Sequence, residues 1–432
     1  MMISDCFAIN DQGHLTIGGC DTVALAKEFG TPLYVMDEDK IRRNCRMYQD
    51  SIQQYYQGRG LVLYASKAFN CKEMCRIIHE EGLGLDVVSG GELYTALQAG
   101  FPADRIHFHG NNKTREELSM ALDAQVGHFV VDNLRELELL DDLAKEKGQV
   151  ADISLRIKPG IDAHTHEAIM TGQIDSKFGF ALETGEALEA IRFAAQFQHV
   201  NLKGLHNHIG SQIFDIEPFL QAARVMLDFI AQIKKEVGVV IEELNLGGGF
   251  GIKYVAQDQP VPYGDYMKEI SLAVFEKCKE LELEIPYIYM EPGRSIVGEA
   301  GLTLYQVGGV KEIPGVRTYV SIDGGMTDNP RYALYQSDYT VVVANKVNEP
   351  KDLVATIAGK CCESGDLIQE HTHIQPVEAG DLLAVLCTGA YNFSMASNYN
   401  RIPRPAVVMV KNGIPRVVVR RETYEDLIRN DQ

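Results

Sequence analysis

The sequence has no apolar run close to the roughly 20 residues that cross a bilayer, and its first ten residues, MMISDCFAIN, lack the basic and apolar segments of a secretory signal. Positive charge is also scarce. There are 41 Lys and Arg against 60 Asp and Glu, a formal net charge of −19. This balance argues against a nucleic-acid binder and against binding to anionic membrane surfaces. We therefore expect a cytoplasmic protein that acts on a small molecule.

Cysteine pairs with CxxC spacing are absent, and the nine cysteines are an odd number spread over 432 residues. This pattern excludes a disulfide scaffold and fits a reducing compartment. The paired histidines His164/His166 and His371/His373 have no Cys or carboxylate cluster at zinc spacing. We interpret them as solvated or hydrogen-bonding residues in loops and predict no metal site.

Apolar runs alternate with helical patterns through the first two thirds of the chain. Eight runs that end in polar or glycine residues start near Leu61, Leu83, Arg105, His128, Ile153, Leu202, Glu243 and Tyr287. Alternation of this kind predicts a parallel sheet with right-handed crossovers, and eight units are the number that closes a barrel. The expected fold is an α/β (β/α)8 TIM-type barrel, with an open doubly wound sheet as the alternative.

After Arg294 the helical spacing largely disappears and short strand-like runs follow, separated by Gly, Pro and Asn turns. This predicts an antiparallel β-barrel or sandwich domain. Residues 411–414 (KNGI) carry an Asn-Gly hairpin signal. We expect residues 1–34 to pack with the β domain, residues 35–285 to form the barrel, and residues 286–432 to form the β domain, with the final barrel strand, 286–292, at the junction.

A lysine follows the first barrel strand. The run LVLYASKAFN, residues 61–70, ends abruptly in Ser66 and Lys67. The carboxyl ends of barrel strands face one mouth, and a desolvated lysine there is an amine nucleophile that can bind a carbonyl cofactor. The other strand ends supply Asp86, His109, Arg156, His206, His208, Ser211, Gly247–Gly249, Glu291 and Arg294.

The residue types at three of these strand ends indicate what each could bind. The glycines 247–249 of LNLGGGFG expose backbone N–H groups that suit a single phosphate, since neither GxGxxG nor a P-loop occurs. Glu291 of EPGR could keep a pyridine nitrogen protonated, or could simply pair with Arg294. His206 and His208 lie two apart; a metal would need a third ligand, and the alternative is that one imidazole stacks on a flat ring.

The ordered motifs resemble the barrel-type, pyridoxal-phosphate-dependent basic amino-acid decarboxylases, and within them the diaminopimelate branch. The resemblance runs from about residue 31 to about residue 410. Its marks are YASKAF, GLDVVSGGE, IHFHGNNKT, RIKPG, AHTHEAIMTGQIDSKFGF, HNHIGSQ, LNLGGGFG, MEPGRSIV, DGGMTDNPRYALY, CCESGD and GAYNFSMASNYN. It implies decarboxylation of meso-2,6-diaminopimelate at its D-centre to L-lysine and CO2, the last step of lysine biosynthesis.

The resemblance also implies roles for residues. Lys67 would hold pyridoxal 5'-phosphate through a Schiff base, Glu291 would pair with the pyridine nitrogen, and His208 would stack on the ring. The remaining cofactor-binding residues would be Asp86, Ser211, Gly247, Gly248, Gly249, Pro292, Gly293, Arg294 and Tyr391. Substrate would be bound by Arg294, Arg331, Tyr335, Glu363 and Tyr391, and Cys362 would be the proton donor.

The family forms head-to-tail homodimers, so Cys362 and Glu363 would reach the partner's barrel mouth. Cys361, directly before Cys362, is a departure from the expected pattern and a second candidate donor. Three other functions are compatible with the motifs: a decarboxylase of ornithine, arginine or carboxynorspermidine, a non-catalytic cofactor-binding relative, and an enzyme like alanine racemase. The last would need a tyrosine base where this chain has the CESGD thiol.

Overall fold

The computed structural model describes residues 2–161 and 176–432. Contacts between Cα atoms divide the chain into two units. The barrel unit comprises Asn44–Gly251 and Pro260–Gly293, and the β unit comprises Met1–Arg43, Ile252–Gln259 and Arg294–Gln432. Each unit is described by itself below. Within the described ranges, no helix combines the length and apolar character needed to cross a membrane.

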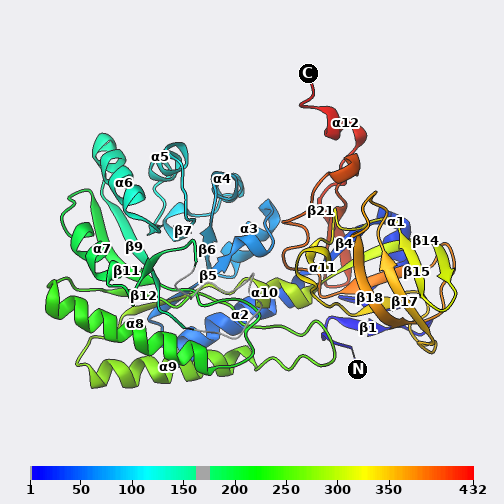
Figure 1. Cartoon of the computed structure of the whole chain (residues 1–432), viewed down its shortest axis with the longest axis horizontal. Coiled ribbons are helices and arrows are strands. Elements are labelled where there is room, and N and C mark those ends of the chain that lie inside the picture. Colours follow the sequence, from blue (N-terminus) through cyan, green and yellow to red (C-terminus); the bar gives the residue numbers. More distant parts are fainter. Residues whose placement is uncertain (1, 162–175) are drawn as a thin grey trace. The chain divides into compact units, whose positions relative to one another are not determined.

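The barrel unit, whose strands and helices Figure 1 shows, is a closed ring of eight parallel strands. Each strand pairs with the next one along the chain, and the pairing of the last strand with the first closes the ring. The strands are β5 (Gly60–Ala65), β6 (Gly84–Val87), β7 (Ile106–Phe108), β8 (His128–Val131), β9 (Ala151–Lys158), β11 (Val200–His206), β12 (Glu243–Asn245) and β13 (Tyr287–Met290). These are the eight predicted runs, and the closure confirms the barrel over the open sheet.

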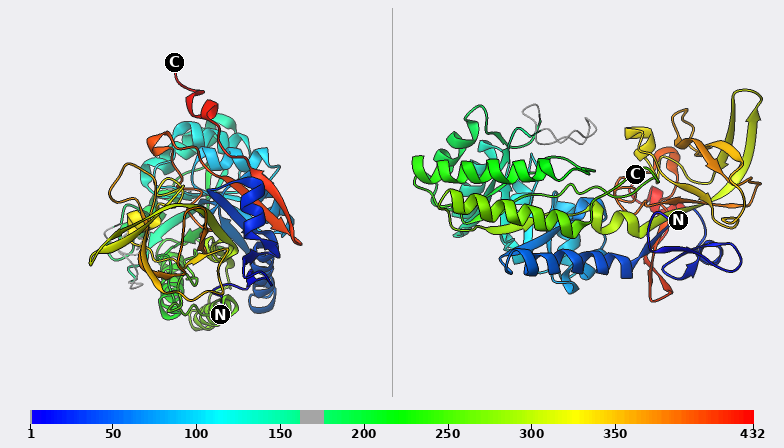
Figure 2. Two further views of the ribbon diagram at one scale, coloured as in Figure 1. Left: turned by 90° about the vertical axis from the view of Figure 1, so that its right-hand side faces the viewer. Right: turned by 90° about the horizontal axis from the view of Figure 1, so that it is seen from below.

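Helices follow the strands because amphipathic segments with good caps lie between the apolar runs. Ser89, Thr114 and Asn133 each accept a backbone N–H at a helix start. The helices are α3 (Lys72–Glu80), α4 (Gly90–Gln98), α5 (Arg115–Asp123), α6 (Leu134–Lys147), α7 (Glu186–Ala194), α8 (Glu217–Glu236) and α9 (Tyr263–Glu280). The long helices α8 and α9 lie side by side in Figure 1 and Figure 2. A short strand, β10 (Phe180–Ala181), also pairs with β9.

The β unit is built on a sheet of order β18-β17-β15-β14-β4-β20-β21, with β19 bridging β14 and β16. Its strands are β4 (Leu33–Asp37), β14 (Gly301–Ile313), β15 (Arg317–Ile322), β16 (Val341–Val343), β17 (Leu353–Ala358), β18 (Leu367–Ile374), β19 (Leu382–Leu386), β20 (Ala406–Lys411) and β21 (Ile414–Val419). The sheet is mixed rather than wholly antiparallel, because β15 pairs with β17 and β4 with β20 in parallel.

The remaining elements complete the fold. Three small strands pair at the N-terminus: β1 (Phe7–Ile9), β2 (Leu15–Ile17) and β3 (Cys20–Asp21). The remaining α-helices are α1 (Thr22–Phe29), α2 (Glu38–Tyr55), α10 (Arg294–Val297), α11 (Arg331–Tyr335) and α12 (Tyr424–Ile428). Single 3-10 turns are η1 (Ser66–Ala68), η2 (Ala103–Arg105), η4 (Gly298–Ala300) and η5 (Tyr399–Arg401).

Two local predictions can be compared with the β unit. The β20–β21 hairpin turns at Asn412 and Gly413, whose φ angles of 51° and 73° are the positive values that an Asn-Gly turn requires, which confirms the hairpin. The loop assignment of His371 and His373 is wrong, because both lie in strand β18. His164 and His166 lie outside the described residues.

Candidate active site

Lys67 lies directly after strand β5, in the 3-10 turn η1. Its side chain is exposed, while the flanking Ser66 and Ala68 are buried. In the described part of the chain, no carboxylate lies within ion-pair distance of its Nζ. The contrast is Lys113, whose buried Nζ lies 2.6 Å from Glu136 Oε1 and also donates to two backbone carbonyls. The Lys67 amine is therefore available to a ligand, whereas the Lys113 ammonium group is held in hydrogen bonds that stabilise the fold.

The Glu291 carboxylate follows strand β13 and is surrounded by three side-chain nitrogens. Oε1 lies 2.8 Å from His109 Nε2 and accepts a hydrogen bond of 2.6 Å from Asn245 Nδ2. Oε2 forms a 3.0 Å hydrogen bond with His206 Nε2. All four side chains are buried. A carboxylate has about four lone-pair sites, so this one has capacity for a further donor.

Burial works against ionisation of Glu291, but the electrostatic and hydrogen-bonding interactions of its carboxylate with the His109 and His206 rings outweigh it and hold the Glu291 pKa well below its ordinary value. Burial lowers the pKa of His206, which favours a neutral ring. Its Nδ1 has no hydrogen-bond partner in the described residues, so we assign the N–H to Nε2, facing Glu291. An ionised carboxylate in this position can pair with a cationic nitrogen.

His109, His206 and Glu291 also form a zinc-type donor set, with ligand atoms within 4.8 Å of one another. A tetrahedral ion bound at about 2.0–2.2 Å would hold its donors roughly 3.3 Å apart or more. The two histidine contacts with Glu291 measure 2.8 and 3.0 Å, which are hydrogen-bond lengths. The arrangement therefore fits a hydrogen-bonded carboxylate better than a metal centre.

Asp86 lies at the end of strand β6, with Oδ1 3.9 Å from His109 Nε2. Burial raises its pKa to about 6; the nearby Glu291 charge adds to the rise, and His109 opposes it. The folded chain therefore binds a proton on Asp86 more tightly than the unfolded chain does, since the ordinary value is 3.8.

The substitution Asp86→Asn is expected to change how the stability of the cofactor-free chain depends on pH. Because the folded-state pKa is raised, the wild-type chain loses stability as the pH rises from about 4 through about 6. Asparagine does not ionise, so the melting temperature of the variant should rise relative to wild type over that window. Melting curves of both chains across this range test the effect; a constant difference between them would contradict it.

The glycine-rich turn after strand β12 has a backbone that only glycine allows. Gly247 and Gly249 have φ angles of 67° and 114°. A Cβ on Gly247 would lie 2.5 Å from the Asn207 carbonyl oxygen, and one on Gly248 would collide with the Glu291 carbonyl. The Gly247 and Gly248 N–H groups donate to Asn245 Oδ1 and His208 Nδ1, whereas the Gly249 N–H has no acceptor in the described residues and can donate to a close ligand, such as a phosphate oxygen.

The neighbouring turns lie against this loop. The segment after Ser211 is held to it by a 3.0 Å bond from the Ile213 N–H to the Gly249 carbonyl. His208 Nδ1 accepts the Gly248 N–H at 3.4 Å. Burial, and then the charge of Lys67, lower the pKa of His208 well below its ordinary value, so its ring is neutral.

The EPGR segment lies beside the strand that carries Lys67. The Pro292 carbonyl accepts the Ala65 N–H at 3.1 Å, and a Cβ on Gly293 would lie 3.0 Å from the Ala65 Cβ. An available amine, an ionised carboxylate and a glycine phosphate loop thus belong to one barrel mouth. These residues fit pyridoxal phosphate, which has an aldehyde, a basic nitrogen and a phosphate.

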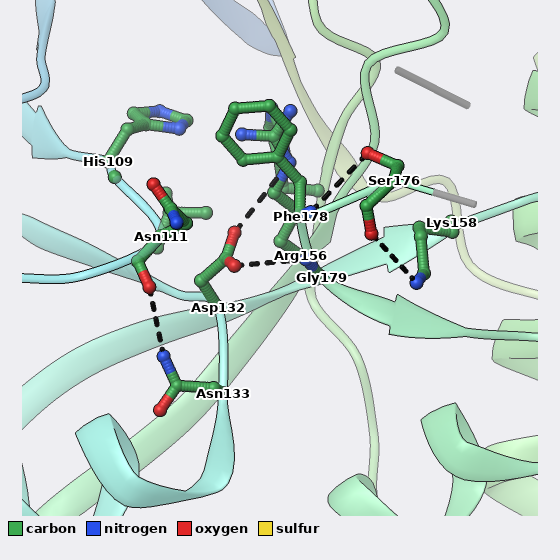
Figure 3. A network of polar contacts seen from close by, with 12 residues as sticks. His109, Asn111, Asp132, Asn133, Arg156, Lys158, Ser176, Phe178 and Gly179 are labelled. Carbon is green, nitrogen blue, oxygen red and sulfur yellow. Dashed lines mark hydrogen bonds and ion pairs between the residues drawn. The ribbon is translucent and has the colours of Figure 1, made fainter. Parts of the chain in front are cut away.

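A second polar network lies at the ends of strands β8 and β9 (Figure 3). Asp132 Oδ2 accepts the Gly179 N–H at 3.0 Å, and its Oδ1 lies 3.9 Å from Arg156 Nε. The Arg156 guanidinium lies over the Phe178 ring at 4.2 Å. Lys158 Nζ donates to the Ser176 carbonyl at 3.4 Å. Asp132 and Arg156 therefore hold the SKFGF segment at the mouth. Asp132 was not among the predicted site residues.

In the β unit, Arg294 and Arg331 share aromatic neighbours. The Tyr391 ring lies 4.7 Å from the Arg294 guanidinium and 5.2 Å from that of Arg331. The Tyr254 hydroxyl accepts a hydrogen bond of 2.6 Å from Arg294 Nη1, and the Tyr335 ring lies 5.7 Å from the Arg331 guanidinium. Both arginines are buried. The structure thus brings together four predicted substrate residues and adds Tyr254, which the sequence did not indicate.

The structure distinguishes the adjacent cysteines, which are both free. Cys361 is buried, and burial raises its pKa to about 11. Cys362 is exposed, and its backbone N–H donates to Asn400 Oδ1 at 2.7 Å. Asp366 fixes the loop by accepting the N–H groups of Cys361 and Met326. Only Cys362 presents a thiol to solvent, with Glu363 exposed beside it.

Comparison with known proteins agrees with this geometry. A family model described as the pyridoxal-binding domain of pyridoxal-dependent decarboxylases matches residues 38–298. A diaminopimelate decarboxylase of Bacillus subtilis (strain 168) is 54% identical over 98% of this chain and 96% of that protein. One of Halalkalibacterium halodurans is 51% identical, with coverages of 98% and 96%.

Solved structures give the same result. A crystal structure of diaminopimelate decarboxylase from M. jannaschii, in complex with L-lysine, superposes with a TM-score of 0.92 at 39% identity. The match covers 100% of this chain and 99% of that one. The chain belongs to the pyridoxal-phosphate-dependent decarboxylases, and within them to the diaminopimelate decarboxylase family.

Proposed function

We propose that this chain decarboxylates meso-2,6-diaminopimelate at its D-centre to L-lysine and CO2, the last step of lysine biosynthesis. The observation that carries the choice of substrate is the pair of buried arginines, Arg294 and Arg331, on the shared face of Tyr391. Diaminopimelate has a distal carboxylate that can bind a guanidinium through paired hydrogen bonds. Lysine and ornithine lack this group and would supply no carboxylate to balance the buried guanidinium charge.

The barrel mouth would hold pyridoxal phosphate, which supplies an electron sink when bound. Lys67 would bind its aldehyde carbon through the amine nitrogen. Glu291 would face the pyridine nitrogen as a carboxylate, and the neutral His208 ring would stack on the cofactor. The glycine turn Gly247–Gly249, through the Gly249 N–H, together with Ser211 and the Pro292–Arg294 turn, would hold the phosphate, with Asp86 and Tyr391 nearby.

The remaining steps belong to residues of the β unit. The Cys362 thiol would donate its proton to the carbon that has lost CO2, and the thiolate would recover a proton from solvent. Glu363 would bind the distal ammonium group, and Arg294 and Arg331 the distal carboxylate. Tyr335 and Tyr391 would form the wall of this subsite. The burial of Cys361 supports Cys362 as the donor.

Arg331→Ala is expected to lower kcat/KM for meso-diaminopimelate by about 100-fold or more, because it removes a buried partner of the distal carboxylate. Any residual turnover of lysine or ornithine should change little. The matched control is Arg317→Ala, since Arg317 belongs to the same unit and pairs with Glu370 near the surface. Equal losses on all substrates would contradict the proposed role of Arg331.

A substrate panel tests the function itself. The cofactor-loaded chain should release CO2 from meso-diaminopimelate far faster than from ornithine, arginine or carboxynorspermidine. A preference for any of these others would replace the proposed substrate while keeping the reaction class. No turnover of any of them, with cofactor bound, would indicate a non-catalytic relative.

We also propose that the protein is a cytoplasmic, head-to-tail homodimer in which Cys362 and Glu363 serve the partner's barrel mouth. The basis of the proposed assembly is the resemblance described above to a family of head-to-tail homodimers. The free state of all nine cysteines fits a reducing compartment.

A further inference from the structure

Asn245, the last residue of strand β12, links two parts of the barrel mouth. Its Oδ1 accepts the Gly247 N–H at 2.9 Å, and its Nδ2 donates to Glu291 Oε1 at 2.6 Å. The Glu291 N–H in turn donates to the Gly247 carbonyl at 2.7 Å. The three residues therefore form a closed hydrogen-bonded ring that joins the glycine-rich loop to the carboxylate.

The orientation of the Asn245 amide follows from these partners. Gly247 presents an N–H and Glu291 presents an oxygen, so only one amide orientation satisfies both contacts. The reversed amide would place its oxygen against the carboxylate and its NH2 against an N–H. Asn245 is 2% exposed, so water does not substitute for either partner.

We infer that Asn245 is a positioning residue that orients the Glu291 carboxylate toward the cofactor and couples it to the glycine-rich phosphate loop. The inference rests on the proposed function in one respect, that Glu291 faces the pyridine nitrogen. His109 and His206 complete the cradle on the other sides of the carboxylate. Binding of the phosphate at the glycine-rich loop and pairing of the pyridine nitrogen with Glu291 are then coupled, because the Asn245 amide contacts both the loop and the carboxylate.

A double-mutant cycle on cofactor affinity tests this coupling. The measurement is the Kd of pyridoxal phosphate for the cofactor-free chain, by calorimetry, without amino-acid substrate. Asn245→Ala should weaken binding about 10- to 100-fold, the range for losing a hydrogen bond to a charged group. In a Glu291→Gln background the same substitution should change Kd less than about 3-fold, because the charge through which Asn245 acts is already gone.

Two outcomes would overturn the inference. Equal effects of Asn245→Ala in both backgrounds would mean that Asn245 acts only through the fold of the loop. A Glu291→Gln chain with wild-type affinity would remove the role of Glu291, and with it that of Asn245. Neither outcome depends on turnover, so retention of meso-diaminopimelate decarboxylation would separate failure of this inference from failure of the proposed function.

The variant Asn245→Asp gives an independent test that does not remove the side chain. When protonated, its carboxyl group can accept from Gly247 and donate to Glu291 as the amide does; when ionised, it opposes the Glu291 charge. Cofactor affinity of this variant should therefore approach wild type at low pH and fall as the pH rises. A pH dependence identical to that of the wild-type chain would contradict the inference.

The controls for both Asn245 variants come from other residues of the same barrel. Both Asn245 variants keep the other ionisable groups around Glu291 and its neighbours, namely His107, His109, His206, His208, Asp86, Arg156 and Lys67. Their titration is therefore common to the wild type and the variants. Asn201→Ala removes an exposed strand asparagine that bonds Asp152 at 2.7 Å, and should leave the cofactor Kd unchanged.

Discussion

The Lys67→Ala variant is expected to lose decarboxylase activity by about 10,000-fold or more and to lose its covalent label after borohydride reduction. Lys67 is the exposed amine at the end of strand β5 and has no competing ion pair in the described residues. Without it, the cofactor has no amine nitrogen of the protein to bind. The measurement is mass spectrometry of peptides after reduction of the cofactor-loaded chain.

The control for the label is Lys203→Ala. Lys203 lies on strand β11 of the same barrel and pairs with Glu242 at the surface, so both label and activity should persist. If the label remains in the Lys67 variant, the cofactor is bound to another lysine. Lys113 is the least expected position for the label, because its buried ammonium group already donates hydrogen bonds to Gly110 and Glu136.

The second large effect concerns the two adjacent cysteines. Cys362→Ala is expected to lower kcat about 100- to 10,000-fold, the usual contribution of a positioned proton donor. Cys361→Ala should leave kcat within a few-fold and cost about 1 kcal/mol of stability, because it truncates a buried side chain. The measurements are steady-state rates and melting curves of both variants. The reverse pattern would assign the proton donor to Cys361.

Mixing inactive variants tests whether that thiol serves a partner's barrel. Refolded mixtures of Lys67→Ala and Cys362→Ala chains should regain about a quarter of wild-type activity, since half of the random dimers would contain one complete site of two. Each site would draw Lys67 from one chain and Cys362 from the other. No recovery on mixing would contradict the proposed shared sites.

The barrel could be predicted from sequence because its signals are local. Each strand is an apolar run, each helix has its own amphipathic period, and the alternation of the two dictates parallel pairing. The β unit depends instead on distant partners. Strand β4, before the barrel, pairs with β14 and β20, which lie after it. No local pattern reports such pairing, and this is why the mixed character of the sheet was missed. Strand β18 was missed because polar residues dominate its exposed face.

The site residues also differ in whether a local sequence pattern can identify them. Lys67 and Glu291 could be singled out because each breaks an apolar run at a strand end. Asn245 gives no such signal, since it reads as one more residue of the strand before the glycines. Its role depends on hydrogen bonds to groups 2 and 46 residues away. The choice between Cys361 and Cys362 required burial, because adjacent residues in an irregular loop have no periodicity from which to infer their direction.

The measurement that tests the account most directly compares the stereoisomers of diaminopimelate. The chain loaded with pyridoxal phosphate should convert the meso isomer to equal amounts of CO2 and L-lysine, and it should leave the LL isomer, which has no D-centre, unchanged. The same chain without cofactor should do neither. Equal turnover of the meso and LL isomers, or CO2 release without lysine, would contradict decarboxylation at the D-centre.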